Sequence, residues 1–173
     1  MTLLLKQIFA FIKMLNSETG HNQMAAGIAA GFVLGMTPML SLQSFLVFIL
    51  IFFFRIQMGA AFLAAFFFAF IGWILDPVFH SVGSAVLEMD SLEPLFTTMY
   101  NMPLVPLTRF NNSIVMGSGV VTILASPFVY LLSLYLIKKY RATVLVWLKE
   151  TKLWKAFKAT AIYNWYYTYD KLY

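Results

Sequence analysis

The sequence predicts a polytopic all-α integral membrane protein, and three observations support this fold class. Of the 173 residues, 61% are hydrophobic and 11% are charged, with a mean hydropathy of +0.80, whereas soluble domains carry about 25% charged residues. The 18 Phe, 9 Tyr and 4 Trp suit a surface that faces lipid, because lipid does not penalise exposed apolar side chains. The basic residues, which give a net charge of +5, flank the apolar runs. The positive-inside rule explains this distribution, so no nucleic-acid partner is predicted.

Composition also excludes several classes of function. Cysteine is absent, which rules out disulfides, thiolate zinc sites and cysteine nucleophiles. The chain shows no metal-ligand cluster, nucleophile elbow or phosphate-binding loop, so we expect no metal, no cofactor and no enzyme activity. Lys6 and Lys13 interrupt the first apolar stretch, and no small-x-small site follows it, so a cleaved signal peptide is not expected. Residues 1–173 are expected to form one domain.

Residues 2–16 predict an amphipathic helix that lies in the membrane interface. On a helical wheel the apolar side chains share one arc, and Lys6 and Lys13 lie on the opposite side with Thr2 and Gln7. The segment is too short and too charged to span a bilayer, so its lysines are expected to face anionic lipid headgroups.

Residues 24–54 form an apolar run without charge whose length fits neither one span nor two. A single span needs about 20 residues, and two spans with a turn need more than about 40. Pro38 divides the run into residues 24–37 and 42–54, each about 20 Å long as a helix. Two half-length helices joined at residues 37–41 predict a re-entrant hairpin. The alternative is one tilted helix, kinked at Pro38, with its ends among the lipid headgroups.

Residues 58–87 predict a membrane span followed by a short helix. Residues 58–75 supply about 18 apolar residues, just enough to cross a bilayer. Asp76 and Pro77 are expected to end this span, because a polar N-cap followed by proline is a common helix start. Residues 78–87 then form the short helix.

The rest of the chain predicts a polar external loop at residues 88–112, a second span at residues 113–137 and a basic, aromatic tail at residues 138–173. The loop carries acidic side chains and three prolines, and the second span has Pro127 near its middle. Part of the tail is amphipathic, with apolar side chains on one face and lysines on the other. Its aromatic residues suit the membrane interface, so the tail is expected to bind anionic lipid.

The distribution of charge predicts the orientation. Lys6, Lys13, Arg55 and the basic cluster at residues 138–158 belong on the cytoplasmic side, and the acidic loop at residues 88–112 belongs outside. A cytoplasmic hairpin, an outward span and a return span satisfy these requirements together. We therefore expect a multi-pass plasma membrane protein with both termini in the cytoplasm.

Gly27, Gly31 and Gly35 stand four residues apart in the first apolar run. On a helix they form a smooth face on which another helix backbone can pack closely. The functional alternative is a pore or substrate path lined by exposed backbone.

Three pairs of a polar residue and a proline, at Pro38, Pro77 and Pro127, predict helix breaks. Such pairs are ordinary helix starts. The functional alternative is that broken helices point their ends at a site near the bilayer midplane, as in transporters built from repeats.

A candidate ligand or proton site comprises Asp76, His80, Thr37 and Gln43. Asp76 and His80 lie four residues apart on one helical face, and ionisable residues within a membrane are functional candidates because they are costly there. The structural alternatives are that Asp76 caps the following helix and that Gln43 and Ser41 satisfy backbone groups freed at the preceding turn.

These motifs, in this order, resemble the bacterial membrane family called domain of unknown function 2062 (DUF2062), over roughly residues 20–85. The resemblance rests on Gly27, Gly31 and Gly35, followed by Thr37-Pro38, Leu42-Gln43-Ser44, Arg55 and Asp76-Pro77. The chain departs from the family at Ser41, where glycine is common, and at Asp76, where asparagine is usual. The second departure puts in question any role there that needs an uncharged amide. The resemblance implies a bacterial inner-membrane protein without an established activity.

Two classes of function remain open. The first is a structural or accessory subunit of the cell envelope that works with a membrane protein partner or as a homo-oligomer. The glycine face, the interfacial helices and the few buried polar groups suit this class. The second is a small transporter or lipid-translocating protein that uses the broken helices and the Asp76/His80 pair. We favour the first, because transport of a polar solute usually needs more polar residues within the membrane.

Overall fold

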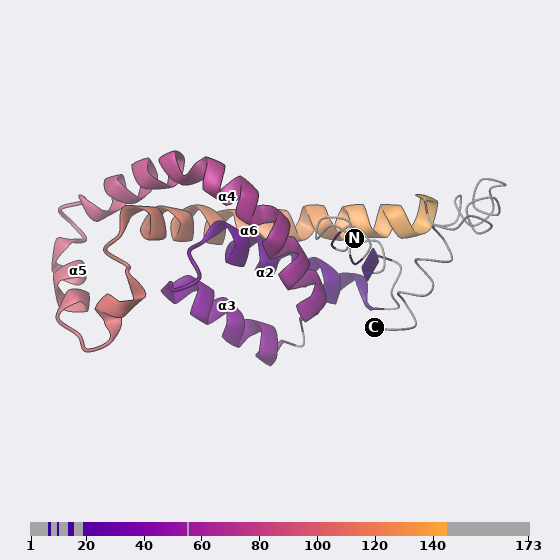
Figure 1. The fold of residues 1–173 in the computed structure, drawn as a ribbon, viewed down its shortest axis with the longest axis horizontal. Coiled ribbons are helices and arrows are strands. Elements are labelled where there is room, and N and C mark those ends of the chain that lie inside the picture. Colours follow the sequence, from indigo (N-terminus) through magenta and orange to yellow (C-terminus); the bar gives the residue numbers. More distant parts are fainter. Residues whose placement is uncertain (1–6, 8–9, 11–13, 16–18, 55, 145–173) are drawn as a thin grey trace. The chain divides into compact units, whose positions relative to one another are not determined.

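The computed structural model describes residues 7, 10, 14–15, 19–54 and 56–144, and no strand occurs among them (Figure 1). The all-α class is therefore confirmed. The regular elements are α2 (His21–Met36), α3 (Leu42–Phe53), α4 (Met58–Leu87), α5 (Glu93–Tyr100), the 3-10 helix η1 (Val105–Thr108), α6 (Ser113–Lys139) and the π-helix η2 (Tyr140–Val144).

The chain divides into two compact units, and residues 19–134 form the larger one. In the other unit, the Arg141 Nε donates a hydrogen bond to the Leu15 carbonyl oxygen at 3.1 Å. The predicted interfacial helix at residues 2–16 and the predicted tail at residues 138–173 fall largely outside the described residues, so both stay predictions.

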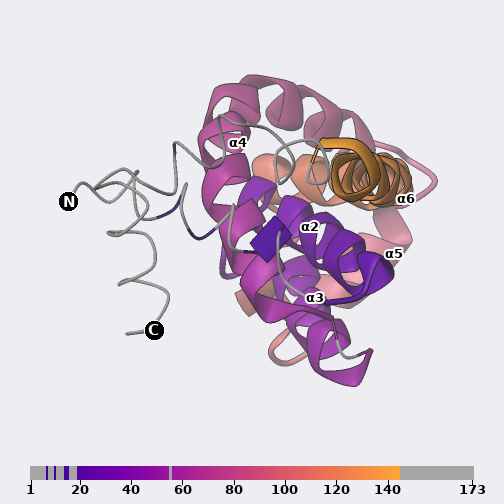
Figure 2. The same ribbon diagram turned by 90° about the vertical axis from the view of Figure 1, so that its right-hand side faces the viewer.

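α2 is a short helix buried within the larger unit (Figure 2). Nine of its 16 residues are buried, and it packs against both α3 and α4. Val121 and Ala125 of α6 pack against the cluster that Phe32 and Val33 form with Phe79 of α4, which is fully buried. α2 is therefore an internal helix that its neighbours enclose.

The glycine face of α2, which consists of Gly27, Gly31 and Gly35, lies against α4. A methyl group built at Gly27 would lie 2.7 Å from the Ala60 Cβ, and one built at Gly35 would lie 2.9 Å from the Phe68 Cβ. Because later residues of α2 meet later residues of α4, the two helices run in the same direction. The contact is helix packing through nearly bare backbone.

The chain breaks between α2 and α3 at Pro38. Thr37, which ends α2, adopts an extended conformation with φ −108° and ψ 148°, because the helical conformation of a residue clashes with a following proline. Ser41 then caps α3, and its Oγ accepts a hydrogen bond from the Ser44 N–H at 3.3 Å. Residues 24–54 were expected to form either two half-length helices or one helix kinked at Pro38. The structure has two helices there, α2 and α3.

α4 runs unbroken from Met58 to Leu87 with Pro77 inside it. The expected helix break at Asp76 and Pro77 is wrong, and Asp76 does not cap a new helix. Ending the helix there would leave as many as four N–H and four C=O groups without helical partners, whereas an internal proline removes one hydrogen bond. Where water cannot reach the backbone, the continuous helix is less costly.

α6 also runs unbroken, through Pro127, so the expected break at Pro127 is wrong as well. Pro127 has no N–H, so the Ile123 carbonyl, one turn earlier, loses its helical donor. The Ser126 hydroxyl replaces that donor with a hydrogen bond of 2.9 Å to the Ile123 carbonyl oxygen. One serine thus satisfies the group that the proline leaves open.

The segment between α4 and α6 contains more regular structure than the external loop expected there. It includes α5 and η1, and the Phe96 and Phe110 ring centroids lie 6.2 Å apart. Leu104 and Arg109, at the two ends of η1, have positive φ angles of 73° and 57°. Asn112 Oδ1 then accepts hydrogen bonds from two N–H groups in the first turn of α6, as an N-cap residue does.

Two helices are long and apolar enough to cross a membrane. They are Met58–Leu87, with 30 residues, and Ser113–Thr143, with 31 residues, and each has a mean hydropathy of 2.2 over its apolar stretch. Large apolar side chains on them remain exposed, with Trp73 at 77% and Leu124 at 76%. A core helix of a soluble protein would bury such side chains, so these surfaces indicate association with a membrane.

Candidate functional site

The hydroxyl side chains of Thr37, Ser41 and Ser44 form a buried cluster at the break between α2 and α3. Each of these residues is at most 5% exposed. The Ser44 Oγ lies 2.9 Å from both the Thr37 Oγ1 and the Ser41 Oγ, and it donates to the Pro38 carbonyl oxygen at 3.1 Å. The Thr37 hydroxyl donates to the Val33 carbonyl oxygen at 2.8 Å.

This hydroxyl cluster uses its own hydrogen-bonding capacity to close the break. Each hydroxyl has one proton to donate. Ser41 gives its proton to the Ser44 Oγ, and Ser44 and Thr37 give theirs to backbone carbonyl oxygens. Because all three protons go to protein oxygens, the geometry supports a structural role for Thr37 rather than the ligand-binding role considered from sequence.

Gln43 joins α3 to α6. Its Nε2 donates to the Val115 carbonyl oxygen at 2.8 Å, across 72 residues of sequence. Gly119, one turn after Val115, leaves room for the amide, because a methyl group built there would lie 3.0 Å from the Gln43 Nε2. An apolar groove of about 370 Å³ borders all three residues. The hydrogen bond is thus a polar link between helices in apolar surroundings.

Replacing Gln43 with methionine should destabilise the fold. Methionine has a similar length but cannot donate to the Val115 carbonyl. Interhelical hydrogen bonds in membrane proteins average about 0.6 kcal/mol and reach about 1.7 kcal/mol, so purified protein in detergent should unfold at a lower temperature. Gln23→Met is the matched control, because Gln23 is exposed on α2. Equal losses in the two variants would contradict the role given to Gln43.

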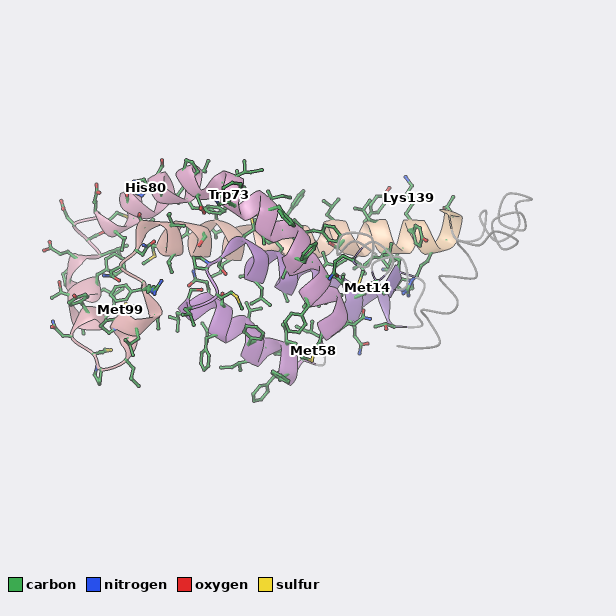
Figure 3. The ribbon with its side chains drawn as sticks, in the orientation of Figure 1. Met14, Met58, Trp73, His80, Met99 and Lys139 are labelled. Atoms are coloured by element: carbon green, nitrogen blue, oxygen red, sulfur yellow. The ribbon has the colours of Figure 1, made fainter. Side chains whose placement is uncertain are left out.

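Asp76 and His80 share a face of α4, because four residues separate them on a continuous helix. No ion pair joins these two described residues; instead, the His80 Nδ1 lies 2.6 Å from the Ser113 Oγ at the start of α6. Figure 3 shows His80 and Trp73 on the same stretch of α4. The site predicted at Asp76 and His80 stays a prediction, and the contact that His80 makes is with Ser113 of α6.

The backbones of α4 and α6 meet at Gly83 and Gly117. A methyl group built at either glycine would lie 2.8 Å from the backbone nitrogen of the other. This glycine crossing was not found from sequence, since the two residues lie on different helices and belong to no repeated spacing. Ser113 was missed for the same reason. Clusters of small residues around each glycine were the available signal.

The four candidate residues do not assemble into one site. Thr37 bonds within its own turn, Gln43 bonds to α6, and His80 bonds to a different part of α6. Within the described part of the chain, no group of three or more His, Cys, Asp or Glu side chains could hold a metal ion. Asp76, inside a long apolar helix, is the candidate whose role these contacts do not explain.

The fold defines a small all-α protein with two helices that can cross a membrane and a short, buried, glycine-faced helix packed against the first of them. Residues 8–144 match the family described as an uncharacterized protein conserved in bacteria (DUF2062), and the chain belongs to that family. The resemblance drawn from the motifs is thus confirmed. A protein of Treponema pallidum (strain Nichols), named an uncharacterized protein, is 28% identical over 138 residues, which cover 80% of this chain and 85% of the relative. No solved structure matches the chain.

Proposed function

We propose that this protein is a multi-pass component of the bacterial inner membrane, with a structural or accessory role in the cell envelope. It acts with a membrane protein partner or with further copies of itself, and it catalyses no reaction. One observation carries the proposal: the polar side chains at the break between α2 and α3 bond to the protein itself, while large apolar side chains face outward. Polar side chains that bond within the protein hold its helices together. The apolar side chains that face outward are then available to pack against a partner.

In this proposal α2 and α3 form a re-entrant pair that enters from the cytoplasmic side. As helices they rise about 24 Å and about 18 Å, both less than the roughly 30 Å hydrocarbon core of a bilayer. Non-helical backbone at membrane depth must be satisfied by protein groups, and the hydroxyl cluster supplies such groups. α4 and α6 are the outward and return spans, and α5 lies outside.

Reporter fusions should then place both termini in the cytoplasm. A reporter joined after residue 16 or after residue 173 should be active only as a cytoplasmic reporter, and one inserted near residue 100 only as an external reporter. The reason is the bias of Lys and Arg toward the cytoplasmic side. Immunoblots control for expression of each fusion. A cytoplasmic signal near residue 100 would contradict the proposed topology.

α3 presents the outward face best suited to a protein partner. Phe45, Phe52 and Phe53 are 63%, 69% and 81% exposed, while Ser44 and Ile51 on the other side of the helix are buried. Aromatic side chains are enriched at protein interfaces, where they bury large areas. The partner that fits this face is an apolar membrane helix.

Photo-cross-linking in cells tests the assembly role. A photoreactive amino acid at Phe53 should give a discrete protein adduct, whereas the same amino acid at Leu124 of α6 should give lipid adducts. Mass spectrometry of the adduct then identifies either another protein or a second copy of this chain. Lipid adducts alone at both positions, and at the other exposed positions of α3, would refute the assembly role.

A second candidate, movement of lipid, is favoured by one apolar groove. The groove has a volume of about 430 Å³, and its lining includes Ala26 of α2, Val47 of α3 and Tyr130 of α6. This lining suits an acyl chain. A lipid retained in stoichiometric amount in native mass spectrometry, and lost in Ala26→Phe, would favour this candidate. The transport mechanism based on a helix break at Asp76 and His80 loses support, because α4 is continuous.

A further inference from the structure

The connection between α4 and α6 exposes two leucine side chains at a single turn. Leu104 and Leu107 are 75% and 73% exposed. The Leu107 N–H donates to the Leu104 carbonyl oxygen at 3.1 Å, and a turn closed in this way brings its first and last residues within about 7 Å. The two leucines therefore lie close together on the surface, and we call them the leucine face.

The backbone at the leucine face is strained. Leu104 has φ 73° and ψ −28°, and Arg109, at the other end of η1, has φ 57° and ψ 29°. These left-handed conformations are costly for residues with a Cβ atom, and glycine and asparagine adopt them most easily. Leu104 gains little from burial within the protein, because three quarters of its side chain is exposed. A contact outside the protein accounts for an apolar side chain at this position.

The leucine face lies at one end of the two helices that can cross a membrane. The connection begins where α4 ends, at Leu87, and it finishes where α6 begins, at Ser113 (Figure 1). Phe110 is only 6% exposed, and its ring centroid lies 6.2 Å from that of Phe96 on α5. This ring contact holds α5 near the start of α6. In the proposed topology the leucine face is therefore held at the outer boundary between hydrocarbon and water.

The charges of the connection are divided between its two halves. Glu88, Asp90 and Glu93 are exposed in the first half. From residue 94 to residue 112 the sequence has one charged side chain, Arg109, which is also exposed. The acidic half suits water, whereas the second half combines the leucine face with a single cation.

This combination favours lipid over protein as the partner. Surfaces that bind the membrane interface place leucine among the upper parts of the lipid chains and basic side chains near the headgroups. The Arg109 guanidinium can donate to lipid phosphate oxygens, and its stem can extend along apolar surface while its charge stays in water. Leucine is under-represented among the residues that dominate binding between proteins.

We propose that the leucine face inserts into the outer leaflet of the membrane that α4 and α6 cross, with Arg109 among the phosphate groups of the phospholipids. The lipid buries the two leucines, and the turn anchors the outer ends of both spans. The inference rests on the proposed topology, and it requires no protein partner. It makes the second half of the connection a lipid-binding element rather than a polar loop in water.

Depth measurements on single-cysteine variants test the insertion. The chain has no cysteine, so Leu107→Cys and Ser91→Cys each supply one site for a polarity-sensitive fluorophore. Ser91 is exposed in the acidic half of the connection and is the matched control. The full-length protein is placed in vesicles of phosphatidylethanolamine and phosphatidylglycerol that contain spin-labelled lipids, which quench the fluorophore according to depth. The label in Leu107→Cys should lie roughly 5–10 Å below the headgroup boundary, and the label in Ser91→Cys should lie in water.

Two results of the depth measurement would overturn the proposal. The first is a label in Leu107→Cys that lies in water, as in Ser91→Cys. The second is a label that is shielded from water but not quenched by spin-labelled lipid, because protein would then cover the leucine face. The reporter near residue 100 tests the topology separately. A label in water together with an external reporter would reject the insertion and leave the proposed topology standing.

Substitutions of Leu104 in the Leu107→Cys background give a second measurement. Leu104→Asn removes the apolar side chain, and asparagine adopts the left-handed conformation readily, so the melting temperature in detergent should not fall. In vesicles the label should nevertheless move toward water and lose its quenching by lipid. Leu104→Met keeps an apolar side chain at the same position and should retain the depth of the parent. Equal depths of the label in the asparagine and methionine variants would overturn the proposal.

Discussion

Gly31→Leu is expected to remove nearly all folded protein from the membrane. Gly31 lies in the middle of the contact between α2 and α4, where a methyl group would be 2.6 Å from the Ala64 Cβ and 2.9 Å from the Ala65 backbone nitrogen. Backbone atoms cannot rotate away as a flexible side chain can. Overpacking costs about 1–3 kcal/mol where neighbours can adjust, and a larger loss is expected here because α2 is enclosed. The measurement is the yield of monodisperse protein after detergent extraction.

Gly59→Leu is the matched control for this experiment. Gly59 lies in the first turn of α4, and a methyl group built there would meet nothing within 4 Å. The same change of residue should therefore leave the yield intact or raise it, since glycine is a poor helix former by about 1 kcal/mol. Equal yields from the Gly31 and Gly59 variants would mean that the glycine face of α2 organises no contact.

The sequence predicts the face that α2 uses in its contact with α4, but it does not predict the partner helix. The four-residue spacing of Gly27, Gly31 and Gly35 identifies a packing face, and residues 60–65 of α4, which include four alanines, supply a complementary small surface. Nothing in the spacing shows that these two segments pair, or that they run in the same direction. That arrangement depends on α3 as the return connection, which is a property of the whole fold.

The three prolines explain why helix breaks were predicted correctly at one position and wrongly at two. All three follow a polar residue, so the local signal before the proline is the same. The difference lies after it: Pro38 is followed by Ser41 and Ser44, whose hydroxyls satisfy backbone groups in the open turn. Pro77 is also followed by two serines, at positions 81 and 84, but there the Ser81 hydroxyl donates to the Pro77 carbonyl oxygen within the continuous helix. Serines after a proline are therefore not sufficient to predict a break, and the cap that Ser41 gives to α3 is a feature of the folded turn.

The polar contacts that fix the fold were beyond sequence analysis for a different reason. Gln43 was identified as a residue that could satisfy backbone groups at the turn, yet its partner, the Val115 carbonyl, lies 72 residues away on α6. His80 was paired with the nearest ionisable residue, although its contact is Ser113, 33 residues away. Helical periodicity predicts which residues share a face, but it does not predict which faces meet.

Alanine at Gly83 and Gly117 is expected to produce strongly non-additive losses of stability. At the glycine crossing, a methyl group built at either residue would lie 2.8 Å from the backbone nitrogen of the other, and it would also press on the Ser113 or Phe79 carbonyl oxygen. Either single substitution therefore forces α4 and α6 apart, at a cost of about 1–3 kcal/mol. Once the helices have separated, the second methyl group enters space that the first has already opened.

The double variant should accordingly lose clearly less stability than the sum of the two single losses, with a coupling energy of about 0.5–3 kcal/mol. Reversible unfolding in mixed detergent, applied to the wild type, both single variants and the double variant, measures this coupling. Gly119→Ala is the control on α6. Its methyl group would meet the movable amide of Gln43 at 3.0 Å, so its loss should be small and additive with that of Gly83→Ala. Additive losses for Gly83 and Gly117 would mean that the two glycines share no contact, and the His80–Ser113 hydrogen bond would then have to hold α4 against α6.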